Sequence, residues 1–189
     1  MNGPCMEFCE KYMLEHEVVG KTILDVGSYN INGSFRTVLE PYKPSKYFGV
    51  DMELGPGVDE VCSAIDLIER FGEESFDIVI STEMLEHAED WKKTIHNIKT
   101  VCKPEGTILI TTRSRWFPYH GCPEDFSRFE AQDMLNIFSD CLVTGIMSDY
   151  VAPGIFIKAR KLKDFKENDL SDYKVYDISG EKPDTTGTV

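Results

Sequence analysis

Two carboxylates beside apolar segments have the most legible chemistry in this chain. Asp25 lies in the apolar run 22–26 and is followed by Gly27, and Asp51 ends a second apolar run, 46–50, about 25 residues later. That spacing is close to that of an acid that holds a ribose hydroxyl. The glycine lets backbone N–H groups approach a ligand closely, and the N-terminus of a following helix would face it. The pattern predicts a ligand that contains a nucleoside.

A second set of reactive residues lies in the stretch 113–126, which carries several aromatic residues without a helical or strand period. Its best candidate for a base is His120, because imidazole titrates near neutral pH. An exposed loop histidine, and an Asp125 that merely caps a helix, are the plain alternatives. Guanidinium groups match planar anions, and aromatic rings can line a substrate. We therefore assign catalysis to His120 and Asp125, and substrate contacts to Arg113, Trp116, Tyr119 and Arg128.

Hydrophobic periodicity predicts the elements that must position these residues. Strands alternate with helices through five strands, which is typical of a mostly parallel sheet with helices on both faces. Two further strands, separated by Pro153-Gly154, would close the sheet as an antiparallel hairpin. The predicted strands are 22–26, 46–50, 58–61, 76–81, 107–112, 142–149 and 154–160. The predicted helices are 5–19, 34–39, 67–71, 90–102 and one that a capping box opens at Ser127.

Length and composition favour one domain. A chain of 189 residues, of which 41% are hydrophobic, can bury a single sizeable core. We assign that domain to residues 1–160, with the N-terminal helix inside 1–19. Residues 161–189 are polar and have few apolar anchors, so we expect a flexible tail.

Charge and cysteine usage exclude several classes of partner. A net charge of −13 repels phosphates and anionic lipid, so we expect no nucleic-acid partner. No apolar run approaches the ~18 residues that span a bilayer, and we expect no membrane partner. Six cysteines without paired spacing favour a reduced, cytoplasmic protein over a disulfide framework. The four histidines share no ligand spacing, so the sequence predicts no metal site.

Three segments in order carry a resemblance to a known family. They are Ile23-Leu24-Asp25-Val26-Gly27-Ser28 with Asn32-Gly33-Ser34, Tyr47-Phe48-Gly49-Val50-Asp51 with residues 55–59, and residues 75–87. Over roughly residues 20–160 the chain resembles the class I S-adenosylmethionine-dependent methyltransferases, in particular the type 11-like domains. The resemblance implies a three-layer α/β/α, Rossmann-like fold with seven strands, and S-adenosyl-L-methionine as the cofactor.

The resemblance also implies roles by position. The implied cofactor contacts are Asp25, Gly27, Ser28, Asp51, Met52, Ser63, Ala64, Ser81 and Glu83. The first three would line the methionine part of the cofactor, and Asp51 would hold its ribose. The chain departs from the family pattern at Ser28-Tyr29-Asn30, where many relatives have a second glycine. It departs again at Ser63, where an aspartate usually accepts from the adenine amino group, and Asp66 could substitute.

The expected function is methyl transfer to a small-molecule or sugar-type acceptor, at oxygen. Two alternatives stay open. A catalytically silent binding subunit with the same fold is favoured by Ser63 and the atypical turn. A nicotinamide-dependent oxidoreductase would need Gly-x-Gly-x-x-Gly after the first strand, whereas this chain has only Gly27 and Gly33 there. Neither the acceptor nor the oligomeric state is legible in the sequence.

Overall fold

The structure is a computed structural model that describes residues 3–121 and 124–183. Its centre is a seven-stranded sheet in the order β3-β2-β1-β4-β5-β8-β7. Neighbouring strands from β3 to β5 pair in parallel, and β8 pairs antiparallel with both β5 and β7. The strand bounds are Thr22–Val26 (β1), Lys46–Asp51 (β2), Glu60–Val61 (β3), Phe76–Thr82 (β4), Cys102–Arg113 (β5), Cys141–Ser148 (β7) and Gly154–Lys161 (β8). The predicted mostly parallel sheet with its closing hairpin is confirmed.

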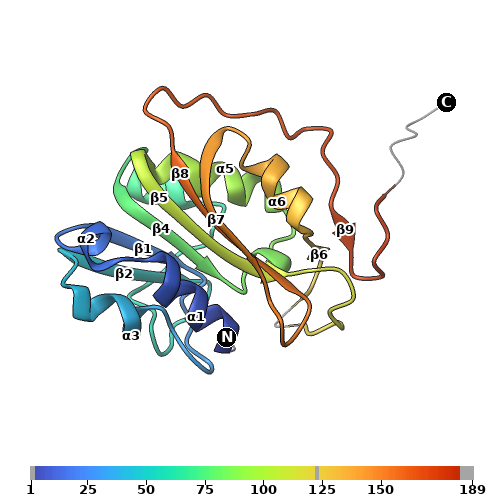
Figure 1. The fold of residues 1–189 in the computed structure, drawn as a ribbon, viewed down its shortest axis with the longest axis horizontal. Coiled ribbons are helices and arrows are strands. Elements are labelled where there is room, and N and C mark those ends of the chain that lie inside the picture. The colour runs from blue at the N-terminus through green and yellow to red at the C-terminus, as the bar shows by residue number, and fades with distance from the viewer. Residues whose placement is uncertain (1–2, 122–123, 184–189) are drawn as a thin grey trace.

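Helices cover both faces of the sheet and make three layers, with α1 to α3 opposite α5 and α6 (Figure 1). The short η1 extends α3, and η2 follows β4. The bounds are Gly3–Tyr12 (α1), Glu15–Val18 (α2), Arg36–Leu39 (α3), Glu40–Tyr42 (η1), Leu67–Phe71 (α4), Leu85–His87 (η2), Trp91–Val101 (α5) and Ala131–Ile137 (α6). None of the helices in these described ranges is long and apolar enough to cross a membrane.

Alternation along the strands divides the core in two. Ile23 in β1 and Ile78 in β4 belong to the cluster that packs under α1 and α3, together with Phe8. Their chain neighbours Leu24 and Val79 point to the other face and join the cluster that includes α4, α5 and α6. Because both faces are buried, these strands are apolar at almost every position instead of alternating with polar residues.

Several predicted boundaries are corrected. The single helix predicted over 5–19 is two helices, α1 and α2, separated at Met13 and Leu14. The capping box predicted at Ser127 is wrong, because Ser127–Arg128 form the short strand β6. The following helix is capped by Glu130, whose N–H donates to Asp133 Oδ2 at 2.9 Å. A strand partner outside the local segment thus overrides the local capping signal.

The end of the chain is also more ordered than predicted. After β8 it runs back over α5 and α6 to the strand β9, Tyr176–Asp177, which pairs antiparallel with β6 (Figure 1). Val175 is buried beside it, and Lys182 Nζ donates to Asp133 Oδ1 at 2.6 Å. The expected flexible tail is therefore wrong for residues 161–183, which we call the C-terminal strap. Residues 184–189 lie outside the described residues.

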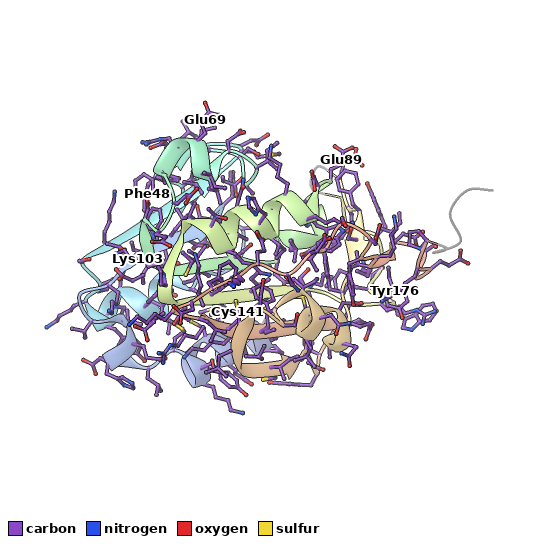
Figure 2. All side chains as sticks on the ribbon, turned by 90° about the horizontal axis from the view of Figure 1, so that it is seen from above. Phe48, Glu69, Glu89, Lys103, Cys141 and Tyr176 are labelled. Atoms are coloured by element: carbon purple, nitrogen blue, oxygen red, sulfur yellow. The ribbon has the colours of Figure 1, made fainter. Side chains whose placement is uncertain are left out.

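The carboxyl ends of the parallel strands all lie toward one end of the molecule. Figure 2 places Glu89, which follows β4, and Tyr176 toward one end of the molecule, and Lys103, at the start of β5, at the opposite end. The carboxyl ends of the parallel strands, where open α/β sheets bind ligands, thus lie toward the Glu89 end. The residues singled out in the sequence follow these strand ends.

Candidate active site at the strand ends

The turn after β1 is shaped by a glycine and closed by its own hydrogen bonds. Gly27 has φ +80°, and a Cβ there would lie 2.5 Å from Met84 Cγ, so no larger residue fits. The N–H groups of Gly27 and Ser28 both donate to the carbonyl of Val50, at 2.9 and 3.0 Å. These donors are therefore used by β2. The helix expected over 34–39 is the four-residue α3, Arg36–Leu39, and the approach of this turn to a ligand stays a prediction.

Asp25 is the most unusual group at this edge. Its carboxylate is 3% exposed, and Oδ2 accepts a hydrogen bond from the hydroxyl of Tyr47 at 2.7 Å. Oδ1 has no hydrogen-bond partner among the described residues. Burial raises the pKa of Asp25 to about 6, because the hydrogen bond from Tyr47 offsets only part of the lost hydration.

Two hydroxyls share this condition. Ser28 follows β1, Ser81 lies in β4, and the Oγ atoms of both are buried without a hydrogen-bond partner in the described part of the chain. With Asp25 they form a group, defined by this shared lack of a partner at the ends of β1 and β4, that we call the unpaired polar row; alternation along the strands puts Asp25 and Ser81 on opposite faces of the sheet. Val26 and Ser81 are neighbours in the pairing of β1 with β4. Buried polar atoms usually have partners, so each of these three atoms is open to a polar group of a ligand at the strand ends.

Asp51 ends β2 and is held by backbone donors. Its Oδ2 accepts from the N–H of Tyr29 at 3.0 Å, and its Oδ1 accepts from the N–H of Met52 at 2.7 Å. A carboxylate has about four acceptor positions, so two remain for a ligand's hydroxyls. The side chain of Met52 is exposed beside it.

The residues expected at an adenine edge follow β3. Ser63 Oγ accepts from the N–H of Ile65 at 3.5 Å, and the carbonyl of Ala64 accepts from Asn97 Nδ2 at 2.9 Å. Both side chains are half-buried. Asp66, the alternative acceptor, stands at the start of α4 and has an exposed side chain.

Glu83 and Arg113 form an ion pair between the ends of β4 and β5. Glu83 has φ +52°, and Arg113 reaches a second carboxylate, Asp149 Oδ2, at 3.3 Å. Burial raises the pKa of Glu83 to about 7, nearby Glu86 adds to the rise, and Arg113 opposes it. Arg113 thus contacts two protein carboxylates, and its substrate contact stays a prediction.

The loop between β5 and β6 is built on a buried ion pair. Arg128 is fully buried and donates to both oxygens of Asp125, at 2.5 and 2.6 Å. It also donates to the carbonyls of Phe117 and Pro118. Burial opposes ionisation of Asp125, but the hydrogen bonds from Arg128 outweigh it and hold the pKa at about 2. The expected substrate contact of Arg128 is corrected, because its guanidinium is enclosed by the loop.

His120 lies over this ion pair. Asp125 Oδ2 accepts from both the backbone N–H and the ring Nδ1 of His120, each at 2.9 Å. Its Nε2 faces Glu86, whose Oε1 lies 3.7 Å away. The neighbouring Glu86 carboxylate, with a further contribution from Asp125, raises the pKa of His120. The structure therefore brings together both residues that the sequence assigned to catalysis.

The two aromatic candidates lie further out on the same loop. Trp116 has φ +74° and is 70% exposed, and Arg115 stacks on its ring at 4.4 Å. Tyr119 is 57% exposed, and its hydroxyl lies 3.4 Å from Glu124 Oε2. Phe117 packs inward, edge-on to the ring of His120. Tyr119 is thus exposed next to His120 in the chain, whereas the exposed ring of Trp116 lies by Arg115 and Gly180.

Glu86 and His87 are neighbours of His120 that the sequence did not assign to the site. Both lie in η2, and the rings of His87 and His120 are 4.7 Å apart, centroid to centroid. Glu86 is fully buried. The only available signal was two titratable residues shortly after a central strand, and helix starts carry the same residues.

Two surface hollows lie away from this edge. One, of about 560 Å³, is lined by Glu15, His16 and Val19 at α2. Another, of about 280 Å³, lies between Trp91 and the C-terminal strap. At the strand ends Cys5 of α1 contacts Glu83, with Sγ 3.6 Å from Oε1. The first helix thus packs against the edge that carries the polar groups.

Comparison with known proteins places this arrangement in a family. The methyltransferase domain family matches residues 5–136. The chain belongs to the methyltransferase domain family. It is 30% identical over 109 residues to a ubiquinone biosynthesis O-methyltransferase of Idiomarina loihiensis, a match that covers 51% of this chain. The chain spans less than half of that relative's length, 44%.

Solved structures share the fold of this methyltransferase-family chain. A 1,6-didemethyltoxoflavin-N1-methyltransferase of Burkholderia thailandensis, solved with S-adenosylhomocysteine bound, has a TM-score of 0.68 at 14% identity. That match covers 84% of this chain and 78% of the other. An S-adenosylmethionine-dependent methyltransferase of Mesorhizobium loti has a TM-score of 0.62 at 16% identity, covering 82% and 96%. The predicted class I methyltransferase fold is confirmed.

Proposed function

We propose that this chain is an S-adenosylmethionine-dependent methyltransferase that acts on a hydroxyl of a small-molecule or sugar-type acceptor. The observation that carries the proposal is the unpaired polar row, Asp25, Ser28 and Ser81, beside the acid Asp51. Family membership supports the cofactor. The relative named as an O-methyltransferase supports oxygen as the acceptor atom.

The residues of the cofactor side fit the groups of S-adenosylmethionine. The unpartnered Oδ1 of Asp25 is a carboxylate acceptor, which suits the ammonium of the methionine part. The remaining acceptor positions of Asp51 suit the ribose hydroxyls, and the exposed, flexible side chain of Met52 offers an apolar contact for a base. Ser63 and Ala64 stand beyond Asp51 for the adenine edge. Ser81 and Glu83 would lie nearest the sulfonium.

On the acceptor side, His120 and Asp125 activate the hydroxyl in this proposal. Asp125 holds the ring through Nδ1, so the Nε2 lone pair is free to act on a proton. When bound, S-adenosylmethionine supplies an activated methyl group on a sulfonium sulfur. His120 Nε2 would take the proton of the acceptor hydroxyl as its oxygen forms the new C–O bond, and would later release that proton to solvent; the electron pair of the broken C–S bond would stay with sulfur. Trp116 and Tyr119 would limit water around the acceptor.

Two alternative functions make different predictions about ligands. A silent binding subunit would bind the sulfur nucleosides without turnover, and an oxidoreductase would bind a nicotinamide dinucleotide. The turn after β1 disfavours the dinucleotide, because it has Gly27 and Gly33 but not the Gly-x-Gly-x-x-Gly that a pyrophosphate needs. The reducing environment of the cytoplasm would suit the buried thiols of Cys9 and Cys102, which form no disulfide.

Isothermal titration calorimetry with S-adenosylmethionine, S-adenosylhomocysteine and NAD tests the proposal. We expect both sulfur nucleosides to bind and NAD not to bind. Asp51→Asn should weaken binding by about tenfold, because a charged acceptor for the ribose is lost. Asp164→Asn, on the strap, is the matched control and should leave binding unchanged. Absence of binding by either sulfur nucleoside would sink the proposal, and turnover in an acceptor screen would exclude a silent subunit.

A further inference from the structure

The cluster of Glu86, His87 and His120 has the composition of a metal site. The structure places a ligand atom of each residue within 4.8 Å of the other two. Two of them come from η2 and one from the loop between β5 and β6, so the fold brings together residues that are far apart in the chain. One carboxylate with two imidazoles is a frequent ligand set for divalent transition metals.

Both histidine rings are fixed in the form that a metal requires. His87 Nδ1 lies 2.5 Å from the carbonyl oxygen of Glu124, and His120 Nδ1 lies 2.9 Å from Asp125 Oδ2. Each partner is an acceptor, so each Nδ1 carries the proton. The Nε2 lone pairs are thereby left for a ligand. Histidines that bind metals are held in this way, with the second ring nitrogen donating to a carbonyl or a carboxylate.

The carboxylate of Glu86 is held in the same manner. It is fully buried, and its Oε2 accepts a hydrogen bond from Thr112 Oγ1 at 2.9 Å. Its Oε1 has no hydrogen-bond partner among the described residues and faces His120 Nε2 at 3.7 Å. A buried carboxylate oxygen without a donor is costly, and a cation is the partner that would compensate it.

We propose that Glu86, His87 and His120 bind a divalent first-row transition-metal cation. A simple ion pair between Glu86 and a charged His120 is the competing account. The ion pair explains less than the metal site does. The 3.7 Å between His120 Nε2 and Glu86 Oε1 is too long for a hydrogen bond, and the ion pair gives no role to the ordered ring of His87. Ligands of one such cation lie about 3 to 3.5 Å apart, so the cluster would close slightly on binding.

The role of the cation rests on the proposed function, whereas the site itself does not. Three protein ligands leave coordination positions open, as catalytic metal sites do. A hydroxyl that reaches an open position has a lowered pKa, so it loses its proton near neutral pH. His120 would then activate the acceptor as a ligand of the cation and not as the direct proton acceptor. Asp125 would fix the ring in either case.

Cobalt binding tests the site in the purified chain after treatment with a chelator. We expect one Co²⁺ per chain, with visible absorption typical of nitrogen and oxygen ligands and without thiolate charge transfer. Glu86→Gln and His87→Gln should each weaken Co²⁺ binding by at least about tenfold. His96→Gln is the control, because His96 is an exposed histidine on α5 that pairs with Glu167. Zn²⁺ should displace Co²⁺.

Titration with S-adenosylhomocysteine on the same samples separates the two proposals. Retained S-adenosylhomocysteine binding by the two cluster variants shows that they are folded, so their loss of Co²⁺ then reports the site. Co²⁺ that fails to bind, or that binds equally to Glu86→Gln and the wild type, would overturn the metal site. Co²⁺ binding without any S-adenosylhomocysteine binding would instead overturn the proposed function.

Discussion

The carboxylates in the two halves of the strand-end edge have different kinds of partner. At the ends of β1 and β2, Asp25 and Asp51 have no arginine as hydrogen-bond partner, and Asp25 keeps an unused buried oxygen. At the ends of β4 and β5, Glu83 is paired with Arg113, and Asp125 is paired with Arg128. In the first half Asp25 and Asp51 accept hydrogen bonds from neutral donors, and Arg36, which pairs with Asp59, acts on Asp25 only from a distance; in the second half the carboxylates are paired directly with arginines.

This difference distinguishes carboxylates that are available to a ligand from carboxylates that stabilise the fold of a loop. Acids without a protein cation are costly when buried, and they persist where a ligand supplies the missing partner. Acids that are paired with buried guanidinium groups hold a loop in one shape. Glu86 is the exception in the second half, since its Oε1 has no hydrogen-bond donor in the described residues although His120 is close. That exception marks where the second half would take a ligand of its own.

Arg128→Gln should have the largest effect on stability. Removing one partner of a buried ion pair leaves Asp125 charged and enclosed, which costs about 3 to 5 kcal/mol of unfolding free energy. Urea unfolding followed by circular dichroism measures the loss. S-adenosylhomocysteine binding at a temperature where the variant is folded should remain near wild type, because Asp25 and Asp51 are untouched.

The matched control for that experiment is Arg160→Gln. Arg160 pairs with Glu105 at 2.8 Å, and both side chains are more than half exposed. Such a surface pair contributes at most about 1 kcal/mol. Equal losses in Arg128→Gln and Arg160→Gln would contradict the structural role of the buried pair. Loss of nucleoside binding in the folded Arg128 variant would show that the two halves are not independent.

Asp25→Asn should have the next largest effect. It should raise the free energy of unfolding near pH 8 and lower the affinity for S-adenosylmethionine. The pKa of Asp25 is about 6 in the folded chain, above its ordinary value of 3.8. The folded state therefore holds this proton more tightly than the unfolded chain does. The contribution of this proton to the free energy of unfolding is fully present below about pH 4. It is lost as the pH rises through 6, and the loss amounts to up to about 3 kcal/mol.

The asparagine variant lacks this titration. Near pH 8 it should be more stable than the wild type by about 1 to 3 kcal/mol, and near pH 5 the gain should be smaller. Its affinity for S-adenosylmethionine should fall by at least about tenfold, because an ammonium loses its charged acceptor. Urea unfolding at both pH values and calorimetry measure the two effects. A variant less stable than the wild type at pH 8 would contradict the raised pKa.

Local signals explain what the sequence made predictable. The bounds of β1 and α4 were predicted as the structure has them, because strand apolarity and helix periodicity are properties of consecutive residues. Asp25 and Asp51 were found for the same reason, since each is placed by its own strand. Pairing across the sheet then brings them to neighbouring strand ends, because Asp25 lies opposite Gly49, two residues before Asp51.

Contacts between distant segments explain what was missed. The burial of Arg128, which the predicted substrate contact does not allow for, depends on a loop that folds back over it. The order of the strap, against the predicted flexible tail, comes from partners of Val175 and β9 that lie in β6 and the helical layer. The Glu86–His120 contact likewise needs η2 and a loop after β5 to meet. The spacing of residues along the chain predicts none of these contacts.

Tyr47→Phe should have the smallest effect and is the sharpest probe of the cofactor half. It removes the one hydroxyl that donates to Asp25 and leaves both carboxylate oxygens without that donor. The loss should be about 1 kcal/mol at pH 5 and larger at pH 8, because the pKa of Asp25 rises further when its hydrogen bond is lost. In the Asp25→Asn background the dependence on pH should disappear. If the loss stayed equal at both pH values in both backgrounds, Tyr47 would act through packing alone, and the contrast between the two halves would rest on Asp25 without its donor.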